Sequence, residues 1–132
     1  MSEQRTRYAI GNALALIYRR PRGDEEKRWQ QQVVGMAALA GWAYYHAFDS
    51  RRSPPGFPDL VLVRGREYLE GWDGPLVIFA EVKAETGQLS IDQMLWGVAL
   101  EAVARVCPRI GYRVWRPSDR ERVKTELTGV AQ

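Results

Sequence analysis

The sequence predicts an α/β fold in which a mixed β-sheet lies between helices. Two segments, 25–40 and 90–106, carry apolar residues at intervals of three and four, which is the spacing of an amphipathic helix. Between them lies a continuous apolar run at 76–83, which is typical of a central strand buried on both faces. Shorter strand-like segments flank this run, so we expect the order helix, strand, strand, strand, helix, strand, helix.

The first helix is expected at 25–40, with Trp29 and Val33 on its apolar side. Asp24 is a candidate N-cap, and Gly41 is a typical residue for the end of a helix. Before this helix, the apolar patch 13–17 lacks a clean signal-peptide cleavage site and is followed by charges. We therefore interpret residues 1–24 as an accessory segment and residues 25–132 as one domain.

The region between the two main helices alternates between strand signals and turn signals. Aromatic and β-branched residues favour strands, whereas Pro and Gly clusters favour loops. The expected elements are a strand at 42–48, a loop at 49–56, a short strand at 59–63, a hairpin connection at 65–74 with Tyr68 and Leu69 extending one arm, and the apolar strand at 76–83.

The second main helix has a clear start signal. Ser90 can cap it, and Gln93 stands three residues later, where a capping box requires it. Its apolar stripe consists of Met94, Leu95, Val98, Ala102 and Val106. Pro108 stops this helix, a strand is expected at 110–115, and Pro117 starts a last helix that carries Arg120, Arg122 and Lys124.

The composition is that of a folded, slightly basic protein. Hydrophobic residues make up 45% of the 132 residues, which excludes a chain disordered by composition. The net charge is +3, which is compatible with phosphate binding. The distribution of arginines is more informative, because a basic rim suits a polyanionic substrate. The candidates for this rim are Arg19, Arg20, Arg22, Arg51 and Arg52.

Several classes of site and location are excluded by residue counts. Cys107 is the single cysteine, so no intrachain disulfide can form, and we expect a cytoplasmic protein with Cys107 in its core. No stretch approaches the roughly 20 apolar residues of a membrane-spanning helix, so no membrane partner is expected. His46 is the single histidine, which excludes a zinc site, and its aromatic surroundings favour a core or edge position.

The residues that carry chemistry stand at the ends of two expected strands. Alternate side chains of a strand share a face, so Glu81 and Lys83 point the same way. If the strand after Asp59 pairs beside them, two carboxylates and an ammonium group converge. Hard oxygen ligands of this kind suit Mg²⁺ or Mn²⁺.

A purely structural interpretation of these residues also exists. Asp59 follows Pro58, as turn residues do, and Glu81 with Lys83 can form an exposed ion pair of little energetic value. Their position argues for a site, because sheet proteins build sites where apolar strands end.

Four motifs in this order resemble the VRR-NUC branch of the PD-(D/E)xK nucleases. They are Glu-Lys-Arg-Trp-Gln at 26–30, Gly-Phe-Pro-Asp-Leu at 56–60, Phe-Ala-Glu-Val-Lys at 79–83 and Leu-Ser-x-x-Gln at 89–93. Gly41-Trp42 before them and the segment 112–117 after them strengthen the resemblance, which runs from about residue 25 to about residue 119. It implies a restriction-endonuclease-like core with a mixed sheet, and an Mg²⁺- or Mn²⁺-dependent DNA endonuclease.

The resemblance also implies a set of metal ligands. By position, Asp59 and Glu81 would bind the metal through carboxylate oxygens, and the backbone carbonyl of Val82 would be a third ligand. Glu26 matches the helix acid that reaches the metal through water, with its neighbour Glu25 as the alternative.

The same resemblance implies two further catalytic residues. Lys83 would position and help deprotonate the attacking water, or stabilise charge on the phosphorane. Gln93 would orient Lys83 or that water. Two other functions use the same fold: a non-catalytic DNA-binding module and an RNA-processing nuclease. The presence of Asp59, Glu81, Lys83 and Gln93 together counts against the non-catalytic module.

Small stand-alone members of this family, often from phages and bacteria, are similar to homodimeric enzymes that cleave DNA junctions. The resemblance therefore implies branched DNA as substrate and a homodimer as the assembly. The apolar segment 13–17 and the hairpin around Trp72 are the expected interface. The alternative is that both segments cover the core of their own monomer.

Overall fold

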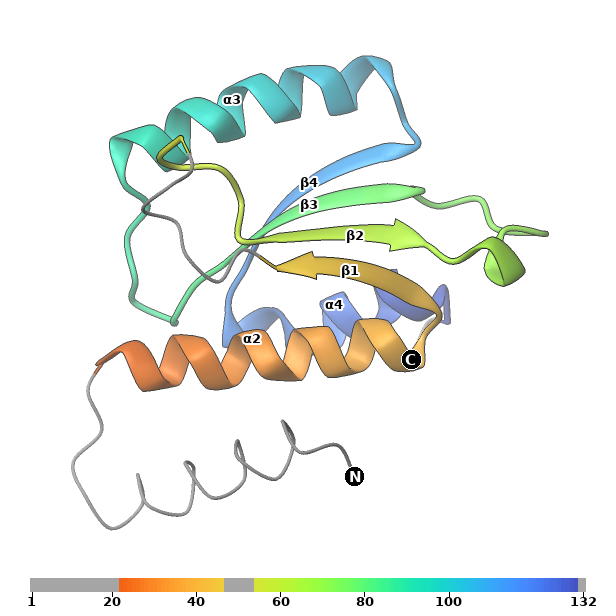
Figure 1. Cartoon of the computed structure of the whole chain (residues 1–132), viewed down its shortest axis with the longest axis horizontal. Coiled ribbons are helices and arrows are strands. Elements are labelled where there is room, and N and C mark those ends of the chain that lie inside the picture. The colour runs from red at the N-terminus through yellow and green to blue at the C-terminus, as the bar shows by residue number, and fades with distance from the viewer. Residues whose placement is uncertain (1–21, 47–53, 131–132) are drawn as a thin grey trace, which may run out of the picture.

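The computed structural model describes residues 22–46 and 54–130 (Figure 1). The apolar segment 13–17 and four of the candidate rim arginines lie outside these ranges, so their roles stay predictions; these arginines are Arg19, Arg20, Arg51 and Arg52. Within the described ranges, no helix is both long enough and apolar enough to span a membrane.

Four strands form one mixed sheet in the order β1-β2-β3-β4 (Figure 1). Their bounds are β1 Trp42–His46, β2 Leu60–Arg64, β3 Val77–Val82 and β4 Ile110–Trp115. The β1–β2 and β2–β3 pairs are antiparallel, and the β3–β4 pair is parallel. The apolar strand therefore has a partner on each side, as its sequence predicts.

Helices cover both faces of this sheet. Helices α2 (Arg22–Leu39) and α4 (Arg120–Thr128) lie on one face, and α3 (Ile91–Val106) lies on the other (Figure 1). Helix α3 connects the parallel strands β3 and β4, because a parallel pair needs a crossover. Within the described residues, two short 3-10 helices, η2 (Arg66–Tyr68) and η3 (Pro117–Asp119), complete the order of elements. The predicted α/β class and element order are confirmed.

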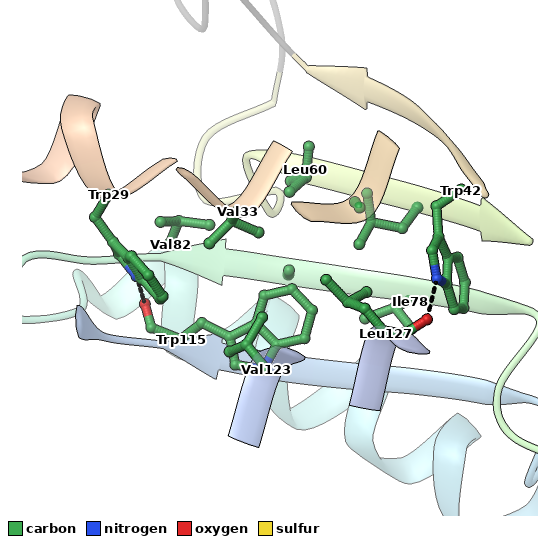
Figure 2. Close-up of a cluster of buried hydrophobic side chains, with 12 residues drawn as sticks. Trp29, Val33, Trp42, Leu60, Ile78, Val82, Trp115, Val123 and Leu127 are labelled. Atoms are coloured by element: carbon green, nitrogen blue, oxygen red, sulfur yellow. Dashed lines mark hydrogen bonds between the residues drawn. The ribbon is translucent and has the colours of Figure 1, made fainter. Parts of the chain in front are cut away.

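The hydrophobic core lies between the sheet and the α2–α4 layer (Figure 2). Its members are Trp29, Val33, Ala37, Trp42, Leu60, Leu62, Ile78, Ala80, Val82, Trp115, Val123 and Leu127. Two of its three indole N–H groups have these partners: Trp29 donates to the carbonyl of Trp115 at 3.0 Å, and Trp42 donates to that of Leu127 at 2.9 Å. These bonds join α2 and β1 to the C-terminal part of the chain.

Several predicted boundaries shift by a few residues. Helix α2 starts at Arg22, so Asp24 lies in its first turn, where its charge suits the helix dipole, and is not the N-cap. Gly41, two residues after the last residue of this helix, has a φ of +92°, as a terminating glycine should. Tyr68 belongs to the 3-10 helix η2, so the prediction that it extends a hairpin arm is wrong.

The structure also locates Trp72 and Cys107, of which Cys107 differs from expectation. Trp72 packs against the core, with its ring edge-on to Trp42 at 5.9 Å and under the guanidinium of Arg64 at 3.8 Å. Trp72 therefore covers the core of its own monomer, which agrees with the alternative given above, and an interface at this hairpin stays a prediction. Cys107 is exposed, because it follows the last turn of α3 where Val106 is 79% exposed. His46 ends the edge strand β1 and is half-buried, which agrees with its predicted edge position.

Helix α3 turns its apolar stripe away from the sheet. All five stripe residues, Met94, Leu95, Val98, Ala102 and Val106, are exposed. The side that meets the sheet contains buried Gly97 and half-buried Trp96 and Leu100. The periodicity identified the helix correctly, but its most apolar side lies outward.

Candidate active site

The pairing of β2 with β3 brings the two predicted carboxylates together. Leu60 is in register with Ala80, so Asp59 lies opposite Glu81. Leu60 and Ala80 point into the core, which places the two acids on the opposite face, under α3. The carboxyl groups of Asp59 and Glu81 share a hydrogen bond. The predicted convergence is therefore present.

Glu81 is the most unusual ionisable residue of this site. Its side chain is only 1% exposed. Burial, together with the hydrogen bond and negative charge of Asp59, raises the pKa of Glu81 to about 9, although Lys83 opposes the shift. Without a cation, the pair therefore holds a proton at neutral pH. A divalent cation would supply positive charge in the place of that proton, so this donor set fits Mg²⁺ or Mn²⁺.

The loop that carries Asp59 is anchored on α3. The Phe57 ring lies edge-on to Phe79 at 5.9 Å and to Trp96 at 5.0 Å. Gly56 has a φ of +88°, and a Cβ added there would lie 2.3 Å from the backbone carbon of Asp92. Only glycine fits this close approach, which fixes the loop and hence the position of Asp59.

Gln93 is oriented by the cap of α3. Its Oε1 accepts a hydrogen bond from the N–H of Ser90 at 2.8 Å, and its own N–H donates to Ser90 Oγ at 3.1 Å. This confirms the predicted capping box. The Oε1 bond directs the amide nitrogen the other way, and Nε2 donates to Glu81 Oε1 at 3.0 Å. Gln93 therefore contacts a predicted metal ligand.

The structure distinguishes Glu26 from Glu25. Glu26 Oε1 lies 3.9 Å from Lys83 Nζ. Burial raises the pKa of Glu26, Lys83 lowers it, and the charge of Asp59 raises it, so Glu26 shares the electrostatic field of the site. The carboxylate of Glu25 instead accepts a hydrogen bond from the N–H of Glu85 at 3.4 Å. The helix acid that faces the site is Glu26.

The donor set is small. Within 22–46 and 54–130, no three His, Cys, Asp or Glu side chains are close enough together to form a metal site by themselves. Two carboxylates are compatible with Mg²⁺, which usually keeps several waters. The Val82 side chain lies in the core, and its carbonyl as a third ligand stays a prediction.

A family model of the VRR-NUC domain matches residues 4–106, which is most of the chain. The chain belongs to the VRR-NUC domain family. No curated protein and no solved structure matches it significantly. The family has a PD-(D/E)xK-like fold, which agrees with the mixed sheet between helices, and it consists of nuclease-type DNA-binding domains. The boundary between residues 24 and 25 stays a prediction.

Tyr112 is a residue of this VRR-NUC site that the motifs alone did not assign. It lies on β4 in register with Phe79. Burial raises the pKa of its phenol, and the charges of Glu81 and Glu101 raise it further. A Cβ on Gly97 would lie 2.6 Å from the Tyr112 oxygen, so this glycine makes room for the ring beneath α3. A glycine inside an otherwise strong helix pattern was the available signal.

Arg116 fixes the turn that follows Lys83. Its Nη1 donates to the carbonyls of Ala84 at 2.8 Å and Gly87 at 2.6 Å, with a longer bond to Glu85 at 3.3 Å. Asp119 accepts the backbone N–H of Arg116 at 2.9 Å. One side chain therefore links the turn beyond β3 to the start of η3. The 112–117 motif contains this arginine, but its contacts cannot be deduced from sequence spacing.

Proposed function

We propose that this VRR-NUC domain is a divalent-metal-dependent DNA endonuclease. The observation that carries the proposal is the pair of buried Glu81 and half-buried Asp59, in which Glu81 accepts a hydrogen bond from Gln93 and lies in the field of Lys83. Two acids are rarely placed side by side for structure alone when one of them is buried, because both desolvation and repulsion oppose it, and Lys83 offsets only part of this cost. The pair therefore supports a cation site better than a structural role.

In this proposal Asp59 and Glu81 hold Mg²⁺ or Mn²⁺, together with the carbonyl of Val82, and Glu26 contributes through water. When bound, the metal polarises a phosphate oxygen and makes a bound water more acidic. Gln93 keeps the Glu81 carboxylate in one orientation through its 3.0 Å hydrogen bond.

Lys83 would supply a positive charge, in addition to that of the metal, next to the reacting phosphate. Its side chain is 15% exposed, so the ammonium group is largely shielded from water, where its effect on developing negative charge is greater. It would position the attacking water and stabilise the phosphorane. Glu26 at 3.9 Å would hold Lys83 in this place.

The proposed substrate is branched, flapped or four-way junction DNA, and the proposed assembly is a homodimer. Two other functions are outcomes of the same test. An RNA-processing nuclease would use the same residues on RNA. A non-catalytic DNA-binding module would bind DNA without cleaving it, and would not require Lys83 in place.

Cleavage assays with Mg²⁺ and Mn²⁺ on duplex, flap, splayed-arm, four-way and RNA substrates test the proposal. Lys83→Ala should lower the cleavage rate by about 10²–10⁴-fold, as loss of a proton-transfer group does. Metal should still raise its melting temperature, because a cation that binds only the folded state stabilises it. Asp59→Asn should lose both the cleavage and the metal-induced rise.

Lys124→Ala is the matched control, since Lys124 is exposed on α4, on the far face of the sheet. It should cleave as the wild type does. If Lys83→Ala cleaved at the wild-type rate, Lys83 would have no role in the mechanism. A wild-type melting temperature that metal does not change would count against a cation site altogether.

A further inference from the structure

The turn at 84–87 follows Lys83 directly and returns to its side chain. The N–H of Gly87 donates to the carbonyl of Ala84 at 3.1 Å, which closes the turn. A Cβ added at Gly87 would lie 3.6 Å from Lys83 Cδ, so this end of the turn lies beside the aliphatic part of the lysine. The position of the turn therefore limits where the ammonium group of Lys83 can lie.

Arg116 holds both ends of this turn. It follows β4 directly, as Lys83 follows β3, and these two strands are parallel neighbours. Its Nη1 donates to the carbonyl of Ala84 at 2.8 Å and to that of Gly87 at 2.6 Å. Hydrogen bonds from a charged donor are roughly twice as strong as neutral ones. The arginine therefore restrains the turn from the neighbouring strand.

Glu85 holds the same turn through a group of opposite charge. Its Oε2 accepts a hydrogen bond from the N–H of Ser118 in η3 at 2.9 Å. Its own N–H donates to the carboxylate of Glu25 on α2 at 3.4 Å. The turn is thus attached to η3 and α2 as well as to Arg116. Because one of these contacts uses a cation and another an anion, the effect of the position of the turn can be separated from the effect of charge.

We propose that Arg116 is a positioning residue of the site: it fixes the 84–87 turn, and the turn keeps Lys83 beside Glu81. This inference rests on the proposed function, in which Lys83 acts on the attacking water and the phosphorane. The lysine stem is flexible, so the ammonium group stays in one place only when the stem is also held. Glu26 lies 3.9 Å from the ammonium nitrogen, and the turn lies beside the stem.

The competing role for Arg116 is direct binding of a DNA phosphate, and the two roles predict different kinetics. Loss of a phosphate contact that is equally strong in the ground state and the transition state raises KM and leaves kcat unchanged. Misplacement of a catalytic group by about 1 Å instead lowers the rate, on the order of 10²-fold.

The first experiment measures kcat and KM for Arg116→Ala on the substrate that the wild type cleaves fastest. We expect kcat to fall about 10²-fold, with KM nearly unchanged. Arg116→Lys should recover most of the loss, because both carbonyl bonds come from one nitrogen and an ammonium group can donate to both. It would not replace a guanidinium that binds phosphate through two nitrogens. Arg105→Ala, exposed in the last turn of α3, is the control and should cleave as the wild type does.

Glu85→Ala gives a result that a lost phosphate contact cannot explain. It loosens the same turn but removes an anion, so no contact with the substrate phosphates is lost. Its kcat should also fall, by less than that of Arg116→Ala, because Arg116 still holds the turn. A wild-type kcat in both variants, with a raised KM in Arg116→Ala, would overturn the proposal in favour of phosphate binding. Melting curves verify that all variants remain folded.

The second experiment does not depend on cleavage. The chain contains three lysines, Lys27, Lys83 and Lys124, so mass spectrometry can follow the acetylation of each one by acetic anhydride. Lys83 should react most slowly in the wild type, because its side chain is 15% exposed whereas the other two lysines are exposed. In Arg116→Ala the rate of Lys83 relative to Lys124 should rise, and Arg116→Lys should reverse this rise. An unchanged ratio in Arg116→Ala would refute the positioning role.

The two experiments separate this inference from the proposed function. If no substrate is cleaved but the labelling of Lys83 responds to Arg116, the nuclease proposal fails and the control of Lys83 by the turn stands. If the wild type cleaves DNA and Arg116→Ala retains both its kcat and its labelling ratio, the nuclease proposal stands and the positioning role of Arg116 is refuted.

Discussion

The two faces of the sheet are built for different purposes. Toward α2 and α4, β3 presents Ile78, Ala80 and Val82, all fully buried in a continuous apolar core (Figure 2). Toward α3, the same strand presents Phe79 and the buried acid Glu81. Neighbouring residues of one strand therefore serve packing on one side and chemistry on the other. The comparison suggests that stability and activity can be changed separately in this molecule.

The polar groups of the two faces show the same division. On the α2–α4 face the buried indoles of Trp29 and Trp42 donate to backbone carbonyls, so burial costs little. On the α3 face Glu81 is buried beside Asp59, and its pKa rises as a consequence. Unfavourable electrostatics of this kind are concentrated at functional sites.

The largest expected effect on stability is on the packing face. Leu62→Ala removes a fully buried side chain of β2 and should lower the free energy of unfolding by about 2–5 kcal/mol. Val61, the residue before Leu62, points toward α3 and is only half-buried. Val61→Ala should therefore cost less than half as much. Urea denaturation measures the free energy of unfolding of both variants, provided that their m-values are unchanged. Equal losses of this free energy in Leu62→Ala and Val61→Ala would contradict the division between the faces.

Much of this site is predictable from sequence because it depends on local periodicity. Strand alternation places Glu81 and Lys83 on one face, and the pairing of consecutive strands brings Asp59 to them. The capping box of Ser90 and Gln93 is also local, and the structure confirms it.

The features that sequence did not predict depend on long-range packing. Glu25 and Glu26 are neighbours on one helix, and only the rotation of α2 in its packing against the sheet decides which faces the site. Periodicity identifies the apolar stripe of α3 but not whether it meets the sheet or the outside. The role of Arg116 depends on its hydrogen bonds to the carbonyls of Ala84 and Gly87, which lie about 30 positions earlier in the chain.

A smaller effect is expected where α3 meets the sheet. Gly97→Ala adds a methyl group 2.6 Å from the Tyr112 oxygen, so α3 or the tyrosine ring must shift. Overpacking should lower stability by about 1–3 kcal/mol. The helix propensity of alanine offsets up to about 1 kcal/mol of this loss. Because Gln93 lies one turn away on the same helix, cleavage should fall as well.

Tyr112→Phe provides the matched test of this contact, because it removes the oxygen that the new methyl group would meet. In the double variant, part of the lost stability should return, and a double-mutant cycle measures the coupling. If the stability losses of Gly97→Ala and Tyr112→Phe simply add, the shift of α3 away from the sheet does not depend on the Tyr112 oxygen.

Over a single pH unit, the smallest expected effect is a pH dependence that belongs to the α3 face. The pKa of Glu81 is about 9 in the folded chain and near its ordinary value of 4.5 when unfolded. Between these values the folded chain holds a proton that the unfolded chain has released, so the contribution of Glu81 to stability is greatest at low pH and falls as pH rises toward the folded pKa. The slope from this one group is at most about 1.4 kcal/mol per pH unit.

Glu81→Gln removes the titration and retains an oxygen that can accept the hydrogen bond of Gln93 Nε2. In EDTA its melting temperature should be close to that of the wild type near pH 5, and the variant should become progressively more stable than the wild type toward about pH 8. Glu121→Gln on the exposed side of α4 is the control and should follow the wild type throughout. Adding Mg²⁺ should stabilise the wild type most at high pH, since the cation then binds without displacing a proton. Parallel curves for Glu81→Gln and the wild type would mean that Glu81 is ionised in the metal-free fold, and the two faces would then not differ in the electrostatic cost of their buried groups.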